Sequence, residues 1–473
     1  MSIDMLQRMN GPKVIAPRRN LYLEQGARFA TLEERLAAGK AIRKKVPRRS
    51  QAFWTPGKNR PDPVALLDGQ NATRVPELVP LRWRRMLESP FAFMRGSAIV
   101  MVTDLASTPN SGIRVQACGD CHLMNFGVYA TPERNLVFDI NDFDETLPAP
   151  WEWDVKRLAA SLELAGRYRS FSRADCADTV RAMVQAYRGF MGRFAEMTSL
   201  EVWYLRLNVE TALAHFFRTA QARKTMMRSL AQAKRRTLES AFIKMTKVVK
   251  GRRRIIDDPP VIFHFDEKSR YPNLNAAFGQ YLSTVRDDLR VLLSKYRVVD
   301  LAIKVVGVGS VGTRCGVMLM MANDGDPLLL QVKEANASVL DVYAGRSAYS
   351  NHGQRVVVGQ RIMQASSDMF LGWTHLRGRD YYVRQLRDMK WALDPSQVGR
   401  QRLQRWARGC GATLARAHAR STDPAVLAGY LGSGDTFDEA MVEFARAYAD
   451  QAERDYATLQ AAAKAKRIKV ARS

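Results

Sequence analysis

Hydrophobic positions follow two different periods along the chain. Over residues 151–250 apolar side chains recur every three or four positions, which is the spacing of the buried face of a helix. From about residue 295, short apolar runs are instead separated by Gly-rich turns, as in strands joined by tight connections. The pattern predicts an α+β protein in which a helical block over 80–250 precedes a small β-rich block over 295–390.

Individual elements can be assigned within these blocks. IRVQACGD and NLVFDIND predict two short strands, with a hairpin-like turn near residues 131–135. The β-rich block predicts three strands, a helix over 350–366, and two further strands in FLGWTH and RDYYVRQL. A helix over 401–419 follows, and a capping box of Thr436 and Glu439 predicts the start of a long final helix.

The charge of the chain is concentrated in three segments. Lys and Arg number 73 against 47 Asp and Glu, a net charge of +26, and this excess lies in residues 1–60, 221–254 and 464–473. We interpret residues 1–75 as a basic arm with one short helix near 31–45, residues 221–254 as a continuation of the helical block, and 464–473 as a basic tail. The remaining residues are neutral overall, so the basic segments are separate from the chemistry proposed below.

These basic segments could recruit an anionic partner or only keep the protein soluble. Phosphate contacts by Lys and Arg would suit a nucleic acid. However, Phe242 is the only aromatic residue in 221–254, so no stacking platform for bases is predicted. A solvated helix face is the alternative interpretation, and we prefer it.

The composition excludes several classes of protein. No apolar run approaches the roughly 18–20 residues needed to cross a bilayer, and the first residues lack the apolar stretch of a secretory signal. Five Cys in 473 residues do not form a disulfide framework. We therefore expect a cytoplasmic protein without membrane association.

Two acidic motifs follow short strands and could carry chemistry. They are GDCHLMN over residues 119–125 and DINDFDE over residues 139–145. Carboxylate and amide oxygens suit Mg²⁺, and an Asp that holds no metal could act as a general base. The alternative is that these residues only cap turns. Cys118–His122 also matches the haem-attachment pattern C-x-x-C-H, but that interpretation needs an export signal that the sequence lacks.

A glycine-rich turn and a strand Lys form a third candidate site. GVGSVG over residues 307–312 lies between two strand-like segments, which is how kinases cover nucleotide phosphates. Lys333 lies in the apolar strand LLLQVKEA, where a buried ammonium needs a partner such as a phosphate. An ordinary hairpin, and a Lys that forms a salt bridge or reaches solvent, are the alternatives.

Several of these segments together resemble one bacterial family. The family called domain of unknown function 2252 is resembled from about residue 75 to about 460 by RVPELVPLRWRRMLESPFAFMRG, CGDCHLMNFG, FDINDFDE, WEWDVKRLAASL, VGVGSVGTRC, LQVKEA and GRDYYVRQLRD. The individual motifs are also similar to those of aminoglycoside and choline phosphotransferases and of wider kinase-like enzymes. GDCHLMN resembles their catalytic loop, and NDFD resembles their metal-binding strand.

The resemblance implies a protein-kinase-like fold of two lobes. The acidic motifs precede the glycine turn by almost 200 residues, the reverse of the kinase order, so the implied fold is circularly permuted. Residues 76–255 and 395–463 would form a large helical lobe. Residues 295–390 would form a small antiparallel β lobe, with Gln385–Asp388 as the hinge.

The resemblance also implies an ATP- and Mg²⁺-dependent phosphotransferase with an unknown small-molecule or protein acceptor. Asp120 would take the acceptor's proton, His122 would brace the loop, and Arg157 could support it. Lys333 would contact the nucleotide phosphates beneath a loop whose matching residues are Gly307, Gly309, Ser310 and Gly312.

Mg²⁺ would be held by residues of both acidic motifs. Asn125 and Asp142 match the family's ligand positions, and Asp139 and Asp144 are further candidates.

One kinase feature has no counterpart in the sequence. Kinases pair the strand Lys with a Glu on a helix, yet no acidic residue lies between Arg346 and Ser367. A substitute would have to come from Asp341, Glu334 or Asp368. A nucleotide-binding module without catalysis is therefore the alternative function.

Overall fold

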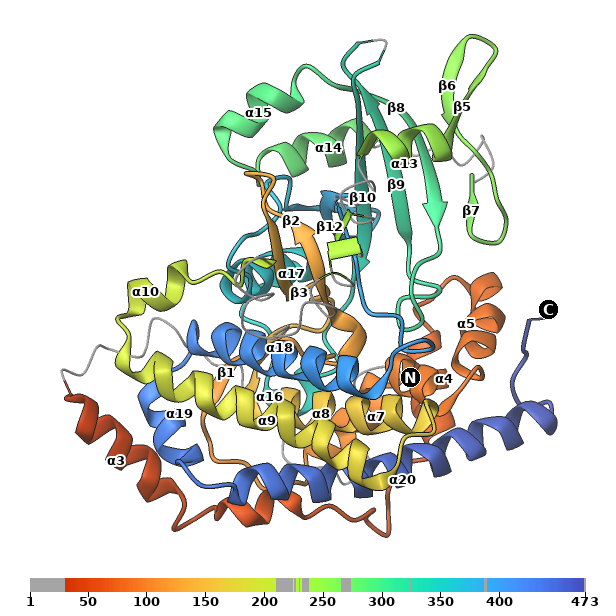
Figure 1. Ribbon diagram of the computed structural model, residues 1–473. Coiled ribbons are helices and arrows are strands. Elements are labelled where there is room, and N and C mark those ends of the chain that lie inside the picture. Colours follow the sequence, from red (N-terminus) through yellow and green to blue (C-terminus); the bar gives the residue numbers. More distant parts are fainter. Residues whose placement is uncertain are drawn as a thin grey trace.

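The computed structural model describes residues 30–209, 224, 227–228, 230–231, 238–264, 274–323, 325–386 and 389–471. It mixes helices and antiparallel sheets, as the hydrophobic pattern predicts. In Figure 1 a six-stranded sheet lies above a layered group of helices. We call residues 238–386 the sheet region, and residues 30–204 and 389–471 the helical region.

The helical region is built from segments at both ends of the chain. Its helices are α3 (Leu32–Ile42), α4 (Pro63–Asn71), α5 (Val79–Met86), α6 (Pro90–Gly96), α7 (Ala98–Leu105), α8 (Trp151–Tyr168), α9 (Arg173–Glu196), α10 (Ser199–Tyr204), α18 (Arg400–Ala419), α19 (Pro424–Leu431) and α20 (Thr436–Lys464). Most of α8 is buried, because α9 and α20 pack against it. Gly411 of α18 lies against the Met183 carbonyl of α9, so a side chain there would prevent this close packing.

The final helix differs from its prediction at one end. Its apolar stripe of Phe437, Met441, Phe444 and Tyr448 is buried, as its spacing predicts. The predicted capping box is wrong, because Asp435 is the N-cap and Thr436 is already helical. Glu439 forms an ion pair with Arg181 of α9 instead, at 2.6 Å.

Two small sheets lie inside the helical region. β1 (Arg114–Ala117) pairs with β4 (Leu147–Pro150), and β2 (Phe126–Ala130) pairs with β3 (Leu136–Ile140). The predicted turn near residues 131–135 is present, with a hydrogen bond of 2.8 Å from the Thr131 amide to the Asn135 carbonyl. However, it joins β3 to β2, which was not predicted, and the predicted first strand, β1, pairs with β4. The loop after β1 and the segment after β3 carry the two acidic motifs, so these sheets determine where the carboxylates lie.

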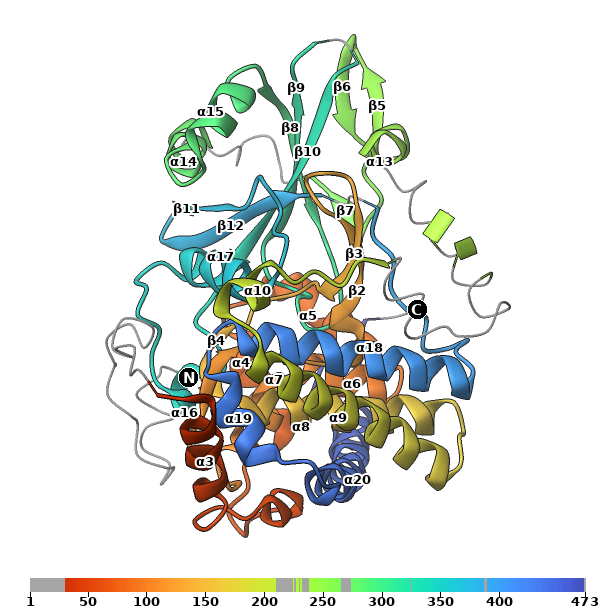
Figure 2. The same ribbon diagram turned by 60° about the vertical axis from the view of Figure 1, so that its left-hand side comes forward.

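The sheet region contains one antiparallel sheet with strands in the order β11-β12-β10-β9-β8-β7. These strands are β7 (Ile262–Phe263), β8 (Arg297–Lys304), β9 (Cys315–Met321), β10 (Pro327–Ala335), β11 (Gly372–Leu376) and β12 (Arg379–Gln385). All five strands predicted between 295 and 390 are therefore confirmed. Figure 2 shows α14 (Leu274–Leu282) and α15 (Asp287–Leu293) on one side of the sheet and α13 (Leu238–Met245) on the other. Short α16 (Asp341–Ala344) precedes α17 (His352–Met363), the predicted helix, which packs on β11 and β12.

Part of the basic segment 221–254 forms a hairpin where a helix was predicted. β5 (Thr246–Val249) pairs with β6 (Arg252–Ile255) through a turn in which Lys250 and Gly251 both have positive φ. Such a turn suits the twist of two short strands, and Val residues favour strands. This hairpin and α13 pack on the sheet, so residues 238–255 do not extend the helical block.

The expected basic arm is packed against the helical region along its described part. The predicted helix near 31–45 is present as α3, and Arg43 donates a hydrogen bond of 2.9 Å to the Tyr430 carbonyl. Arg60 is largely buried between Asp104 at 2.7 Å and Asp455 at 2.6 Å. Residues 1–29 lie outside the described part of the chain.

Within the described residues, none of the helices combines the length and the apolar character that crossing a membrane requires.

Candidate functional site

The loop after β1 is held from below by one carboxylate. Asp154 of α8 accepts hydrogen bonds from the Cys118 amide at 2.6 Å and the Gly119 amide at 2.9 Å. His418 of α18 lies 3.2 Å from the same carboxylate. Gly119 has a φ of 83°, and a side chain there would overlap the Glu145 carbonyl. Glycine is therefore required at the point where the chain turns towards Asp120.

Asp120 combines burial, a fixed orientation and access to solvent. Its Oδ1 accepts a hydrogen bond of 2.7 Å from Arg157 Nε, and its side chain keeps 23% of its surface exposed. The Asn125 side chain donates to the Asp120 carbonyl at 2.6 Å and thereby closes the loop. Burial raises the pKa of Asp120 to about 7, although Arg157 opposes the rise. A carboxylate near this pKa can accept a proton at neutral pH.

His122 braces this loop as a neutral side chain. Burial and the charges of Arg95 and Arg157 lower its pKa well below the usual value. Its Nδ1 accepts a hydrogen bond of 3.2 Å from the Met124 amide, and its Nε2 lies 3.7 Å from Asp120 Oδ2. With Nδ1 accepting, the proton of the neutral ring belongs on Nε2, on the side of Asp120.

The second acidic motif meets the strand Lys and the glycine loop. Lys333 Nζ lies 2.6 Å from Asp144 Oδ2 and 3.6 Å from Asp142 Oδ1. Ser310 of the glycine loop donates to Asp144 at 3.2 Å, and Tyr382 donates to it at 2.6 Å. Burial alone would raise the pKa of Asp144, but Lys333 and Tyr382 together lower it. Residues almost 200 positions apart in the chain therefore form one polar cluster.

Asp139 does not join this cluster. Its carboxylate pairs with Arg416 of α18, and both side chains are almost fully buried. It also accepts hydrogen bonds from the backbone amides of Ile140 and Ala365. These contacts direct Asp139 away from Asp142 and Asp144, so it is engaged in joining α18 to β3.

None of the three acids expected to substitute for the kinase Glu pairs with Lys333. Glu334 pairs with Arg314 at 3.3 Å and Arg379 at 2.7 Å. Asp368 accepts backbone hydrogen bonds, one of them from Phe370 at 2.9 Å. Among the described residues, Asp341 forms no ion pair, and burial raises its pKa to about 6.

Helix α17 instead contributes a cation to this part of the site. Arg355 donates to the carbonyls of Asp144 and Asn336 at 2.8 Å and of Thr146 at 2.7 Å. It therefore fixes the backbone of the acidic motif. The partner of Lys333 comes from that motif itself.

Two residues of β12 belong to the site and were not predicted. The register of β10 and β12 pairs Lys333 with Tyr382 and Gln331 with Arg384. Alternate residues of a strand share a face, so all four side chains point the same way. Arg384 donates to the Asn141 carbonyl at 3.2 Å. The alternation within RDYYVRQ indicates that Tyr382 and Arg384 share a face of their strand. Only the pairing with β10 shows that this face is the one with Lys333.

The glycine loop rests on the helical region. Gly307 and Gly312 have φ values of 65° and 88°, which favour glycine. Val308 is buried in a cluster with Trp83 and Leu459, and the Gly312 carbonyl accepts a hydrogen bond of 2.8 Å from the Val75 amide. The contact of Ser310 with Asp144 therefore places the loop next to the second acidic motif.

A pocket of about 170 Å³ adjoins the polar cluster. Asn141 and Arg384 line the side nearest the acidic motif, and Gln385, from the predicted hinge, also lines it. Residues 387–388 of that hinge lie outside the described residues. Burial and Arg384 lower the pKa of Lys390, another lining residue, to about 7. Apolar and aromatic lining comes from Tyr129, Pro132, Met369 and Phe370.

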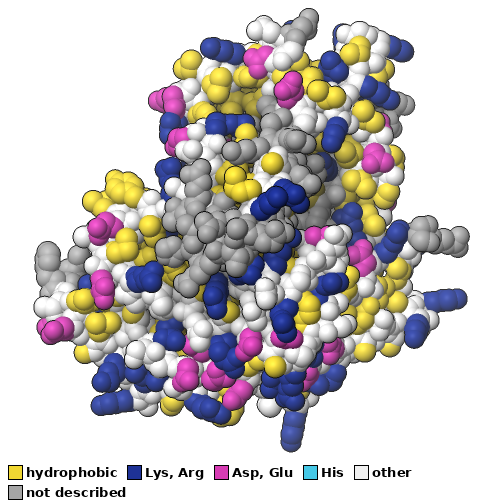
Figure 3. Space-filling view, viewed as in Figure 1, with side chains coloured by type: hydrophobic (Ala, Val, Ile, Leu, Met, Phe, Trp, Pro, Cys, Tyr) yellow, Lys and Arg dark blue, Asp and Glu magenta, His cyan; other side chains and the backbone are white. Residues whose placement is uncertain are grey.

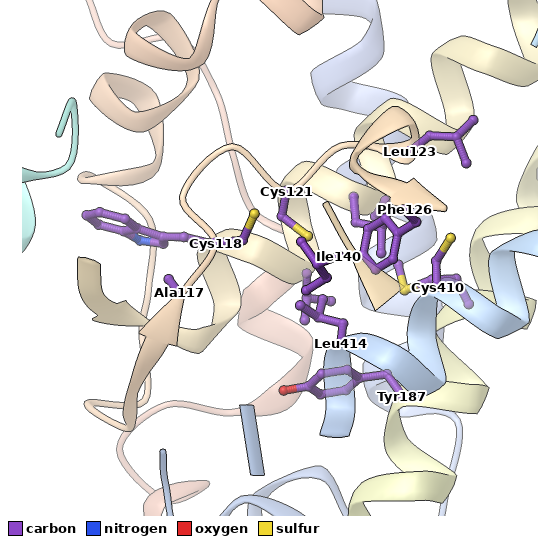
Figure 4. Close-up of a cluster of buried hydrophobic side chains, with 14 of the residues drawn as sticks. Ala117, Cys118, Cys121, Leu123, Phe126, Ile140, Tyr187, Cys410 and Leu414 are labelled. Atoms are coloured by element: carbon purple, nitrogen blue, oxygen red, sulfur yellow. The ribbon is translucent and has the colours of Figure 1, made fainter. Parts of the chain in front are cut away.

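Cys118, Cys121 and Cys410 belong to the core beneath the site. Figure 4 shows Cys118, Cys121 and Ile140 in one apolar cluster, with Cys410 and Leu414 of α18 nearby. All five cysteines are buried and unbonded. Within the described ranges, no group of three or more His, Cys, Asp or Glu side chains is arranged to hold a metal ion.

The basic segments form no single patch on the face shown in Figure 3. There, Lys and Arg are spread over both regions and are interspersed with Asp and Glu. Most of 221–237 lies outside the described part of the chain. On the β5–β6 hairpin, Lys247 and Arg252 are exposed.

Comparison with known proteins gives a single result. A family whose description reads "Uncharacterized protein conserved in bacteria (DUF2252)" matches residues 74–462. The search of curated proteins and the search of solved structures each found no match.

Proposed function

The chain belongs to the DUF2252 family, and because that description names no reaction, we propose one from the site: phosphoryl transfer from ATP, with Mg²⁺, to a hydroxyl of a small-molecule or protein acceptor. The observation that carries this proposal is the cluster of Lys333, Asp144 and Ser310 beside Asp120. It joins a strand Lys, a glycine loop and the second acidic motif at the boundary between the sheet region and the helical region. Asp120 of the first motif is near enough for Asp142 to raise its pKa.

The proposal includes a kinase-like arrangement of two lobes in permuted order. The sheet region would be the small lobe, with the glycine loop between β8 and β9 and Lys333 on β10. The helical region would be the large lobe, with Asp120 and Asp142 at the ends of its short strands. Permutation changes the chain order of these parts and leaves their contacts intact.

Asp120 would act as the general base. In the proposed reaction it accepts the hydroxyl proton of the acceptor while the acceptor oxygen forms a bond to the γ-phosphorus. The bond between that phosphorus and the leaving ADP breaks at the same time, and ADP takes the electron pair. The pKa of Asp120 near 7 suits this role, because a useful fraction of its carboxyl group is ionised at neutral pH. Arg157 and His122 would hold the carboxylate in place.

Lys333 would exchange one anionic partner for another. It is 2% exposed and faces two carboxylates, so its ammonium requires negative charge nearby. Nucleotide phosphates can supply that charge, and Asp142 and Asp144 would then be available to a cation. Bound Mg²⁺ would neutralise charge on the phosphates during transfer.

The acidic residues fit Mg²⁺ in part. Asp142 Oδ1 is buried and accepts no hydrogen bond from the described residues. Asp144 and the amide oxygen of Asn125 are further hard ligands. Because no complete group of protein ligands is present among the described residues, phosphate oxygens and water would have to complete the set, as is usual for Mg²⁺.

The pocket beside Arg384 would take the base of the nucleotide. It offers aromatic and aliphatic surface from Tyr129 and Phe370 together with amide groups of Gln364 and Gln385. A flat heterocycle with polar edges suits such a lining.

The test is a thermal unfolding assay with ATP and Mg²⁺. Binding to the folded state at 100 times the Kd stabilises a protein by about 2.7 kcal/mol, so we expect a clear rise in Tm for the wild type. Lys333→Ala should lose this ATP-dependent rise, whereas Lys247→Ala, at an exposed position of β5, should keep it. No rise in the wild type, or an equal rise in Lys333→Ala, would contradict the proposed nucleotide site.

One observation favours a second candidate, a nucleotide-binding module without catalysis. Helix α17 contributes Arg355 to the site, where an active kinase supplies a Glu for the strand Lys. ATP-dependent stabilisation without label transfer to any acceptor would select this alternative.

A further inference from the structure

Three arginines from the N-terminal part of the helical region flank the glycine loop. Arg74 donates to the Val311 carbonyl and Arg85 to the Gly307 carbonyl. Arg95, near the end of α6, is the third. Among the described residues, none of the three forms an ion pair with a carboxylate, so this side of the loop carries positive charge without a direct anionic partner.

Arg95 lies between the loop and the proposed base. A Cβ at Gly309 would stand 3.1 Å from the Arg95 carbonyl, so α6 touches the loop there. The preceding residue, Met94, accepts a hydrogen bond of 2.9 Å from Arg157, the same side chain that holds Asp120. Arg157 therefore links Asp120 to α6, and the Arg95 carbonyl places α6 beside the glycine loop.

Within the described part of the chain, the Arg95 guanidinium lacks hydrogen-bond partners that its neighbour Arg82 has. Arg82, on the neighbouring helix α5, donates to the Gln70 side chain at 2.6 Å and the Gly96 carbonyl at 3.0 Å. Arg95 donates no hydrogen bond to a described residue, and its Nε is buried. Burial lowers its pKa, while Asp120 and Glu88 raise it without pairing with it. The Arg95 side chain is only partly buried, so its guanidinium is open to an anionic ligand that could form charge-assisted hydrogen bonds with it.

The cations of the site divide into two groups. Lys333 and Arg384 act on Asp142 and Asp144, next to the pocket proposed for the nucleotide. Arg95 acts instead on Asp120 and His122. The first group suits nucleotide phosphates, and the second faces the place where the acceptor hydroxyl must approach its base.

We propose that Arg95, with Arg85 beside it, binds an anionic group of the acceptor, so that the substrate is a hydroxyl compound carrying a phosphate or a carboxylate. The anion site follows from the contacts of Arg95, and its assignment to the acceptor rests on the proposed function. A guanidinium binds a phosphate or a carboxylate through paired hydrogen bonds. The proposed substrate class is therefore hydroxyl compounds that carry either anion.

The test measures binding of inorganic phosphate and, separately, of malonate by calorimetry. We expect the wild type to bind at least one of them, and Arg95→Gln to bind it about tenfold more weakly or worse, because charge-assisted hydrogen bonds are lost. Arg95→Lys should recover part of the affinity. Lys247→Ala, at an exposed position of β5, should bind as the wild type does. The anion that binds more tightly identifies which group the acceptor carries.

The ATP-dependent rise in Tm serves as an internal control, since Arg95→Gln should keep it if the site is folded. Loss of that rise in Arg95→Gln would assign Arg95 to the nucleotide and overturn the inference. Equal anion binding by wild type and Arg95→Gln, or none by the wild type, would overturn it as well. An Arg95-dependent anion site in a protein that ATP does not stabilise would support the anion site while contradicting the proposed function.

Discussion

The helical region and the sheet region compensate their buried charges in different ways. In the helical region Asp120 and Asp139 each have a partner from the same region, Arg157 and Arg416 respectively. Lys333 of the sheet region finds its carboxylates only across the boundary, on Asp142 and Asp144. The loop that carries Asp120 is therefore held by residues of the helical region, whereas the strand Lys depends on the other region or on a ligand.

The same contrast separates the two carboxylates proposed for chemistry. Burial raises the pKa of Asp120 to about 7. The pKa of Asp144 is lowered, because Lys333 and Tyr382 outweigh its burial. Two acids pushed in opposite directions suit two roles, a proton acceptor and a permanently ionised ligand.

Breaking an ion pair inside the helical region should have the largest effect on stability. Arg416→Met leaves Asp139 buried without its cation, which typically costs about 3–5 kcal/mol. Urea denaturation should show a loss of this size in the free energy of unfolding. Arg49→Ala removes an exposed pair with Glu443 and should cost under about 1 kcal/mol. Equal losses in the two variants would contradict the importance given to the buried pair.

The pH dependence of activity should follow Asp120. A general base must be ionised, so kcat/KM should rise with pH to a plateau above about 7. Below that pKa it should fall about tenfold per pH unit, or about 1.4 kcal/mol per unit. Arg157→Gln should move the midpoint to higher pH, because Arg157 opposes the rise in the Asp120 pKa. A flat profile between pH 5.5 and 8 would show that Asp120 is not the base.

The contacts from the sheet to Asp144 should be individually smaller. Tyr382→Phe removes a buried hydrogen bond to a carboxylate, so we expect a loss of about 1.5 kcal/mol in the free energy of unfolding. Lys333 remains next to Asp144 in this variant, which limits the loss in the free energy of unfolding. Calorimetric unfolding measures the difference, and no change would mean that Tyr382 does not stabilise the boundary.

Ser310→Ala should have the smallest effect. Its hydrogen bond to Asp144 is 3.2 Å long and half-buried, and its loss should cost about 0.5 kcal/mol. If the loop is held mainly by Val308 and the Val75 amide, the ATP-dependent rise in Tm should persist. A loss as large as that of Tyr382→Phe would show that Ser310 fixes the loop.

Local patterns explain which parts of the fold can be predicted from the sequence. Apolar runs between Gly-rich turns suffice for β8, β9 and β10, and spacing suffices for the buried face of α20. The hairpin of 246–255 was missed because its flanks read as helix and its turn is only Lys250-Gly251. Thr436 and Glu439 have capping-box spacing, but the preceding Asp435 became the cap.

Contacts between residues far apart in the chain explain which site residues could not be predicted from the sequence. The sequence predicts the site residues that belong to motifs, which are Asp120, Asp142, Asp144, Ser310 and Lys333. It does not predict Tyr382 and Arg384, since only the β10–β12 register places them beside Lys333. Arg95 lies in a segment that resembles the family but belongs to no chemical motif, and its significance comes from the lack of a hydrogen-bond partner among the described residues. Asp139 and Asp142 look alike in sequence, and only the contact with Arg416 distinguishes them.

The central claim is that Asp120 serves phosphoryl transfer from ATP, and one measurement tests it directly. Wild type and Asp120→Asn, each with γ-labelled ATP, Mg²⁺ and extract of the host cell, should bind ATP alike in the thermal assay. We expect the wild type to form a labelled product and Asp120→Asn to form it about 10²–10⁴ times more slowly. Equal labelling by the two proteins, or no labelling by the wild type, would contradict the account.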